Sequence, residues 1–167
     1  SVLAVRIAFV AVSAVTIYII ARFTTLLTQN PAAGVYGAAV ATFYPFFIYY
    51  SSLILSETLF LMMLTLYFHY LFQNRSTDYL RAGIAGGIMH LVKPSLYYFY
   101  PVMLVCQIVF LGHSWKKALI TFTIVILFMI PWGIRNQMVL GEFVTGTTVV
   151  GQVLWEGNNP YNPRGVT

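Results

Sequence analysis

Charged side chains are scarce in this sequence of 167 residues, in which nine Lys and Arg and four Asp and Glu make up 8% of the chain. Soluble domains carry about a quarter charged residues, so these few cannot cover the surface of a water-soluble globule. The single cysteine, Cys106, excludes an intramolecular disulfide. With 59% hydrophobic and 17% aromatic residues, the chain is also neither disordered nor a charged coiled coil. We therefore expect the lipid bilayer to be its main solvent.

Six apolar segments predict an all-α, multi-pass transmembrane bundle over residues 1–134, because a spanning helix needs about 20 mostly apolar residues. The expected helices lie at approximately 3–20, 31–48, 53–72, 80–92, 95–111 and 118–134. Residues 135–167 are polar and Gly-rich, and we expect them to form a short irregular or extended outer tail or the start of a further domain. Arg6 before an apolar run also resembles a signal peptide, which is the alternative for the first segment.

Small residues recur four positions apart in two of these segments, a spacing that lets helix backbones approach closely in lipid. We expect these faces to form contacts within the bundle, with self-association through the last pair as the alternative. The pairs are Ala33 with Gly37, Gly34 with Ala38, and Gly83 with Gly87.

The distribution of basic residues predicts the orientation in the membrane. One set of helix ends collects five of the nine cations, namely Arg22, Arg75, Arg81, Lys116 and Lys117. Cytoplasmic loops are enriched in Lys and Arg, so the opposite ends, including the Lys93-Pro94 corner and the tail, should lie on the outer side. We expect an integral membrane protein of the bacterial inner membrane with a periplasmic tail.

Glu57 is the most informative residue, because it lies about 7 Å inside the third expected helix by helical rise. A charge at mid-membrane costs about 2.5 to 3.5 kcal/mol, so such a carboxylate needs a partner or water. Lys93 is the first candidate partner and Arg135 the second. We expect the three to line a water-filled outer cleft that binds an anionic substrate and stabilises its leaving group. A purely structural ion pair is the alternative.

The remaining polar and aromatic residues give weaker signals. Aromatic clusters at 44–50 and 97–100 fall where interfacial belts are expected, or they line a lipid or sugar groove. No two of the histidines His69, His90 and His113 have the i, i+4 spacing of a helical metal site. His69 or His90 as an axial ligand of a haem or pigment is a further alternative. The sequence identifies no metal ligands and no certain cofactor, and leaves a divalent metal ion open.

Several short strings follow one another in the chain. A proline-tyrosine-serine turn precedes a helix that bears a glutamate, a small-residue helix ends in a basic residue and proline, and a Pro-Trp-Gly-Ile-Arg-Asn string opens an outer loop. These strings occupy residues 44–51, 55–60, 83–94, 131–136, 141–144 and 157–160. Together they resemble multi-pass C-type glycosyltransferases, such as protein O-mannosyltransferases and the lipid A aminoarabinose transferase.

The resemblance implies a sugar donor on a polyprenyl or dolichyl phosphate and direct displacement at the outer face. Lys93 and Arg135 would bind the donor phosphate, Glu57 would support the site, and Tyr49, Tyr50 and Asn136 would line the cleft. At the Lys93 position relatives more often carry arginine. The family's catalytic aspartate lies in a first outer loop, which would fall upstream of Ser1 together with two helices, so we expect a fragment of a longer enzyme or a reduced relative.

Three functions follow from these observations. The leading hypothesis is a membrane glycosyltransferase core that transfers a sugar from a polyprenyl-phosphate donor to an unknown acceptor. The second is a non-catalytic, glycosyltransferase-like subunit that stabilises a larger membrane complex through its small-residue faces. The third is a haem- or pigment-binding subunit. Expected partners are the lipid-linked sugar, membrane lipid and other membrane subunits, and no nucleic acid.

Overall fold

The computed structural model of the chain describes residues 2–53, 55–146, 155 and 157–159. These residues contain α-helices and no strand, which confirms the expected all-α fold. In chain order the elements are α1 (Val2–Thr28), α2 (Pro31–Phe43), α3 (Pro45–Ser52), α4 (Ser56–Gln73), α5 (Asp78–Val92), the 3-10 turn η1 (Pro94–Leu96), α6 (Phe99–Val109) and α7 (Trp115–Leu140).

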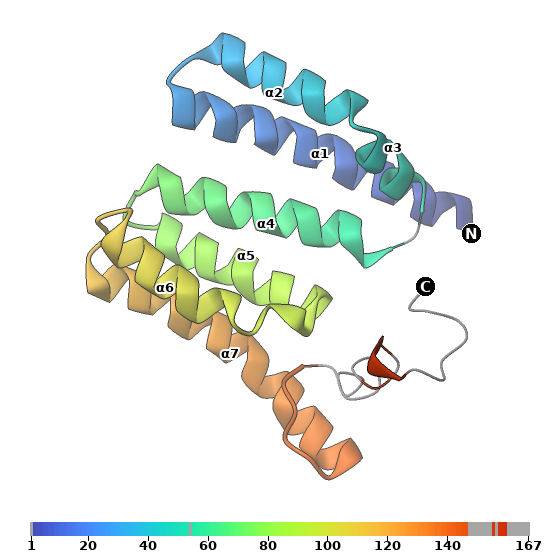
Figure 1. The fold of residues 1–167 in the computed structure, drawn as a ribbon, viewed down its shortest axis with the longest axis vertical. Coiled ribbons are helices and arrows are strands. Elements are labelled where there is room, and N and C mark those ends of the chain that lie inside the picture. Colours follow the sequence, from blue (N-terminus) through green and yellow to red (C-terminus); the bar gives the residue numbers. More distant parts are fainter. Residues whose placement is uncertain (1, 54, 147–154, 156, 160–167) are drawn as a thin grey trace.

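The long helices run back and forth, so the chain has two sets of helix ends (Figure 1). The turns after α1, α4 and α6 lie at one end of the bundle, and the connections from α3 to α4 and from α5 to α6 lie at the other. In space, α1 packs against α2 and α4, α5 packs between α4 and α7, and α6 packs against α7. The alternation places the Lys93-Pro94 corner opposite the turns near Arg75 and Lys116, as the sequence predicted.

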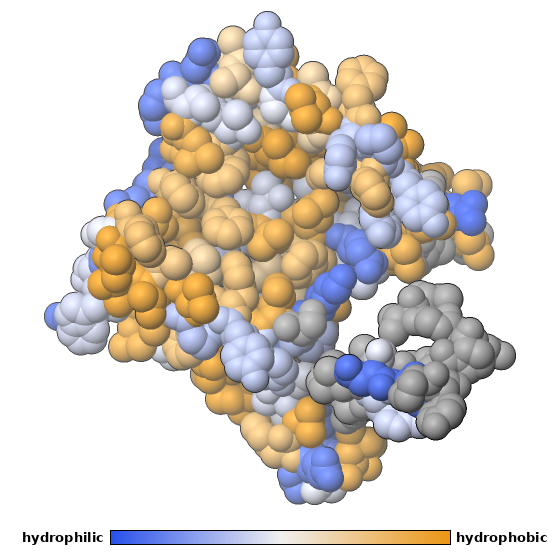
Figure 2. Space-filling view, in the orientation of Figure 1, coloured by the Kyte–Doolittle hydropathy of each residue, from blue (hydrophilic) through white to orange (hydrophobic). Residues whose placement is uncertain are grey.

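Two helices, α1 with 27 residues and α7 with 26, are each long and apolar enough to cross a membrane. The pair of α2 and α3, bent by 62°, passes the same test as one broken span. Of the other segments expected to span, α4 has 18 residues, α5 has 15 and α6 has 11. Large apolar side chains cover much of the bundle surface, with Val35 70% and Phe43 78% exposed (Figure 2). A surface of this kind suits lipid as the solvent.

Two prolines change the helix boundaries that the sequence predicted. Pro45 holds Tyr44 in an extended conformation, with φ −70° and ψ 119°, because the residue before proline avoids the helical region. The expected helix at 31–48 is therefore split into α2 and α3. Pro94 likewise opens a 3-10 turn, so α6 begins only at Phe99 and not at residue 95.

The last helix is longer than predicted, because α7 continues through Pro131 to Leu140 and ends where Gly141 adopts a left-handed φ of 78°. Arg135 and Asn136 are consequently helical residues and not the start of the tail. Residues 141–146 form bends without a strand. Residues 147–154 of the expected irregular or extended tail lie outside the described residues.

The small-residue faces form helix contacts inside the bundle, as predicted. A Cβ added to Gly37 would approach the Thr24 side chain of α1, and one added to Gly83 would lie 2.7 Å from the Cβ of Ile124 on α7. A Cβ on Gly87 would collide with the ring of Phe128 on the same helix. Because α7 covers the Gly83 and Gly87 face, that face is not available for the self-association that was the alternative.

We predict that Gly83→Ala destabilises the bundle by about 1 to 3 kcal/mol, because the added methyl group would force α5 and α7 apart. The check is the melting temperature of the detergent-solubilised protein, which should fall relative to the wild type. Ile84→Ala, at a neighbouring side chain that is 39% exposed, is the control and should melt close to the wild type. Adding Ile124→Ala to Gly83→Ala should recover part of the loss. Unchanged melting of Gly83→Ala would contradict this packing.

Candidate functional site

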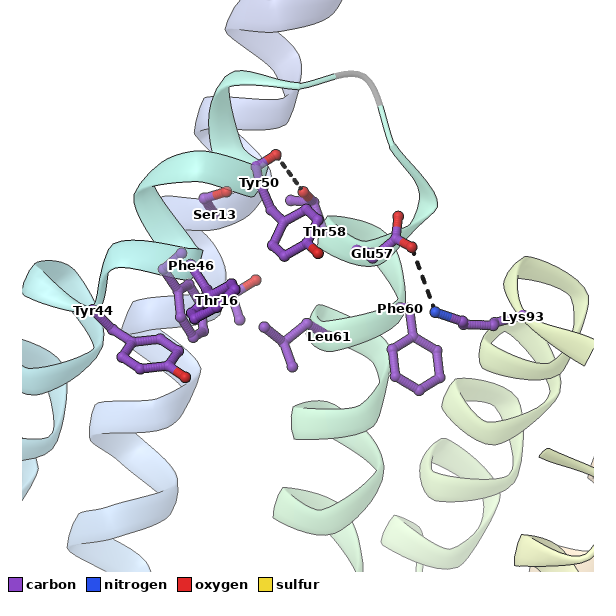
Figure 3. A pocket seen from close by; sticks show the side chains of 11 residues that line it. Ser13, Thr16, Tyr44, Phe46, Tyr50, Glu57, Thr58, Phe60, Leu61 and Lys93 are labelled. Carbon is purple, nitrogen blue, oxygen red and sulfur yellow. Dashed lines mark hydrogen bonds and ion pairs between the residues drawn. The ribbon is translucent and has the colours of Figure 1, made fainter. Parts of the chain in front are cut away.

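A cavity of about 370 Å³ lies between α1, α3, α4 and the end of α5 (Figure 3). Its lining combines one acid and one cation with hydroxyl groups and a larger number of aromatic and aliphatic side chains. The lining residues are Ser13, Thr16, Tyr44, Phe46, Phe47, Tyr50, Glu57, Thr58, Phe60, Leu61 and Lys93.

The charged part of this cavity is the ion pair of Glu57 and Lys93, whose Nζ and Oε1 atoms are 3.5 Å apart. Glu57 lies in the first turn of α4, where the partial positive charge of the helix N-terminus favours a carboxylate. Lys93 caps the C-terminal end of α5, and its ammonium also lies 5.6 Å from the ring centroid of Phe60. The expected pairing is confirmed, and both side chains keep partial access to solvent, at 43% exposure for Lys93 and 35% for Glu57.

The apolar part of the cavity is built mainly by α3, the short helix that follows the Pro45 bend. After the bend, Phe46, Phe47 and Tyr50 of α3 line the cavity. Figure 3 shows Tyr50 close to Thr58 of α4. The Thr58 hydroxyl of α4 donates to the Tyr50 carbonyl at 3.1 Å, which ties the two helices together. In Figure 3 the ion pair lies at one side of the cavity and Tyr44 at the other. The cavity thus has a polar end and an aromatic end.

Ser13 and Thr16 are cavity residues that the sequence reasoning missed. Both belong to α1 and are largely buried, with exposures of 8% and 1%. The Thr16 hydroxyl donates to the Val12 carbonyl at 2.8 Å within its own helix. Two hydroxyl residues three positions apart in an otherwise apolar segment were the available signal, since they lie on one face of a helix.

Three residues expected at the cleft do not line this cavity. Tyr49 is 59% exposed and stacks edge-to-face on Tyr50, because successive residues of α3 point to different sides. Arg135 lies 4.9 Å from the ring centroid of Trp132 and donates to the Asn136 side chain at 3.0 Å. Asn136 is buried and donates to the carbonyl of Val144 at 2.6 Å. The expected convergence of three charges is therefore a pair, since α7 keeps Arg135 beside Trp132.

Two of the three histidines, His90 and His69, make contacts inside the bundle. His90 is fully buried, and its Nε2 lies 3.1 Å from the Thr145 carbonyl. That contact uses the nitrogen that an axial ligand of a haem would offer. His69 contacts Phe23 edge-to-face at the other end of the bundle. Among the described residues, no group of three or more His, Cys, Asp or Glu side chains is placed to hold a metal ion.

Asp78 is a buried acid that the sequence reasoning did not consider. It lies at the start of α5, and its carboxylate accepts from the Arg75 amide at 3.1 Å and from the Arg81 guanidinium at 3.3 Å. These contacts satisfy the carboxylate at the end of the bundle opposite the cavity. Asp78 therefore stabilises the α4–α5 turn and takes no part in the Glu57–Lys93 site.

An ammonium group at one end of an aromatic cavity provides two kinds of attraction at once. The charge favours an anionic group, and charge-assisted hydrogen bonds are stronger than neutral ones. The aromatic and aliphatic lining favours an apolar chain attached to that group. A molecule with an anionic head and an apolar body matches both ends of the cavity, which lies in a protein with an apolar outer surface.

Comparison with known proteins identifies one family. The model of the dolichyl-phosphate-mannose-protein mannosyltransferase family matches residues 1–134, which include the cavity and most of the helices. Comparison with curated proteins and with solved structures gives no match. Since the matched segment covers well over half of the chain, this protein belongs to the dolichyl-phosphate-mannose-protein mannosyltransferase family of C-type membrane glycosyltransferases.

Proposed function

We propose that this chain forms the donor-binding part of a membrane glycosyltransferase that takes a sugar from a polyprenyl-phosphate carrier. The observation that supports it is the cavity in which the Lys93 ammonium lies at the end of an aromatic groove. In this proposal Lys93 contacts the donor phosphate and the groove receives the adjoining part of the lipid. The sugar and the acceptor are left unassigned.

Glu57 acts in this proposal as a supporting acid. When no ligand is bound, its carboxylate holds the Lys93 ammonium at the cavity. The phosphate of a bound donor would compete with this carboxylate for the same cation. Because lysine offers a point charge and not the planar fork of arginine, it can turn from one partner to the other by rotating a flexible stem. Glu57 is engaged with a cation, so we assign the catalytic base to none of the described residues.

The position of the basic residues supports an outer location for the cavity. Arg75 and Arg81 lie at the α4–α5 turn and Lys116 and Lys117 at the start of α7, which share one end of the bundle (Figure 1). The positive-inside rule assigns that end to the cytoplasm. We propose that the cavity opens to the periplasmic or lumenal side, and that a bacterial inner membrane is the setting.

The alternative of a non-catalytic, glycosyltransferase-like subunit would use the small-residue faces to stabilise a larger membrane complex. In the structure Gly37 faces α1 and Gly83 and Gly87 face α7. No specific observation therefore favours that function over donor binding.

We predict that Lys93→Ala in the full-length protein weakens binding of polyprenyl phosphate by roughly 10- to 100-fold, as expected for the loss of a hydrogen bond to a charged group. Binding to the purified protein in nanodiscs is the measurement. Lys93→Arg should retain most of the affinity because it keeps the charge. Glu57→Gln should not weaken binding, since it releases the cation from its carboxylate. The matched control is Lys116→Ala at the opposite end, and an equal loss in that variant would refute the proposal.

The position of Arg135 leads to a separate expectation. Since its guanidinium lies on Trp132 and outside the cavity lining, we expect Arg135→Ala to weaken polyprenyl phosphate binding much less than Lys93→Ala does. The same nanodisc assay measures both variants and the double variant. A loss as large as that of Lys93→Ala, with strong non-additivity in the double variant, would show instead that both cations hold one phosphate.

The proposed orientation can be tested by cysteine labelling in a Cys106→Ala background. Glu142→Cys, just beyond α7, should react with a membrane-impermeant maleimide added to intact cells. Ser114→Cys, in the exposed turn between α6 and α7, should react only after the cells are permeabilised. The reverse pattern would place the cavity on the cytoplasmic side.

A further inference from the structure

The segment after α7 folds back onto the bundle. We refer to residues 141–146 as the strap. The left-handed conformation of Gly141 lets the chain reverse direction at the end of the helix. The Asn136 side chain then holds the Val144 carbonyl at 2.6 Å. Phe143 and Thr145 lie so close to Gly133 that a Cβ there would come within 2.6 Å and 2.9 Å of them.

The strap is also held by His90 of α5, in addition to Asn136 of α7. It lies in the last turn of α5 with no exposed surface, and its Nε2 is 3.1 Å from the carbonyl oxygen of Thr145. A carbonyl oxygen can only accept, so Nε2 carries the proton in this contact. The bond joins residues 55 positions apart in the sequence. His90 therefore connects α5 to the strap directly.

The same histidine packs against the segment that follows the Lys93-Pro94 corner. Its ring meets the ring of Tyr97 edge-to-face at 5.0 Å and that of Tyr100 at 5.8 Å. The Tyr97 hydroxyl shares a short hydrogen bond with the Thr145 hydroxyl. The Tyr100 hydroxyl donates to the Gly86 carbonyl of α5 at 3.0 Å. The end of α5, the start of α6 and the strap thus meet around one buried imidazole.

In the sequence, Lys93 lies between His90 and Tyr97, whose rings are in contact. On one side it ends the helix that carries His90, and on the other the chain reaches Tyr97 within four residues. A displacement of Tyr97 or of the strap would therefore be passed to the backbone of the corner. The ammonium of Lys93 would then shift relative to Glu57 and the aromatic end of the cavity.

We propose that His90 is a positioning residue for donor binding, which holds the strap and Tyr97 against the Lys93-Pro94 corner and so fixes the ammonium that meets the anionic group. This inference rests on the proposed function, in which Lys93 contacts the donor phosphate. It assigns to the strap a role in donor affinity although no strap residue lines the cavity.

If His90 only filled space, its ring would matter and its hydrogen bond to Thr145 would not. An apolar ring of similar size would preserve the packing with Tyr97 and Tyr100, but it would leave the partly buried Thr145 carbonyl without its donor, which costs free energy. The pair of variants His90→Phe and His90→Gln separates these roles. Phenylalanine keeps the ring and loses the donor, whereas glutamine keeps an amide donor near the position of Nε2 and loses the ring.

The experiment uses the full-length protein in nanodiscs and two readouts. The first is the mobility of a spin label at Glu142→Cys in the Cys106→Ala background, measured by electron paramagnetic resonance without ligand. The second is the affinity for polyprenyl phosphate. His69→Phe is the matched control, because it makes the same change at a histidine of α4. The ring of His69 contacts Phe23 and Tyr70, and neither of these residues belongs to the strap.

We expect His90→Phe to increase the label mobility and to weaken polyprenyl phosphate binding by roughly tenfold, with His90→Gln and His69→Phe close to the wild type. Unchanged mobility in His90→Phe would overturn the contact with the strap. Increased mobility with unchanged affinity, while Lys93→Ala still weakens binding, would overturn the positioning role alone. Unchanged affinity in both Lys93→Ala and His90→Phe would overturn the proposed function and the positioning role with it, and the label would still report on the strap contact.

Discussion

The close packing of α5 between α4 and α7 is the constraint on which the rest of the structure depends. Lipid is as apolar as the helix surfaces, so helices in a bilayer gain little from burying apolar area and associate through close contact and hydrogen bonds. Gly83, Gly86 and Gly87 remove side chains from α5 where Ile124, Tyr67 and Phe128 approach it. Because α4 and α7 hold α5 on two sides, the C-terminal end of α5 has a defined position, and so does the Lys93-Pro94 corner that follows it.

The ion pair at that corner has a different physical basis. In an apolar protein a lone carboxylate or ammonium is costly, and each of these two charges lowers the cost of the other. Partial exposure of both side chains means that the pair is not sealed from water. A pair of this kind can exchange one partner for another anion at small cost, whereas a fully buried pair could not. The ion pair thus holds a cation at the cavity and leaves it accessible to water.

Much of this arrangement could be predicted from the sequence, because scarcity of charge makes the position of each charged residue informative. The all-α fold follows from the apolar runs, and the pairing of Glu57 with Lys93 follows from their equal depth near helix ends. The last helix was expected to end at residue 134, which placed Arg135 at the start of the tail. In the structure α7 continues past Pro131 to Leu140, and a helix keeps Arg135 beside Trp132.

The remaining differences between prediction and structure concern the side to which a side chain points, which the periodicity of the sequence does not specify. Tyr49 and Tyr50 are neighbours in α3, and which of them faces the cavity depends on the bend at Pro45, whose angle of 62° no sequence pattern contains. The contact of His90 with the strap joins residues that are 55 positions apart in the sequence. The contact of Asn136 with the strap forms only because the chain reverses direction at Gly141. Such contacts arise from tertiary packing and leave only isolated polar residues in an apolar run as their signal.

The cavity and the strap use the same turn of α5 for opposite purposes. In the function proposed for the cavity, Lys93 must remain able to leave Glu57 for another anion, which requires a flexible stem and access to water. His90, three residues earlier, is fully enclosed and bound to a backbone carbonyl. A mobile charge can be selective only if its backbone is held still, since the position of the ammonium otherwise varies with the chain. In the proposed donor site, the rigid histidine contact and the exchangeable lysine contact are therefore complementary requirements.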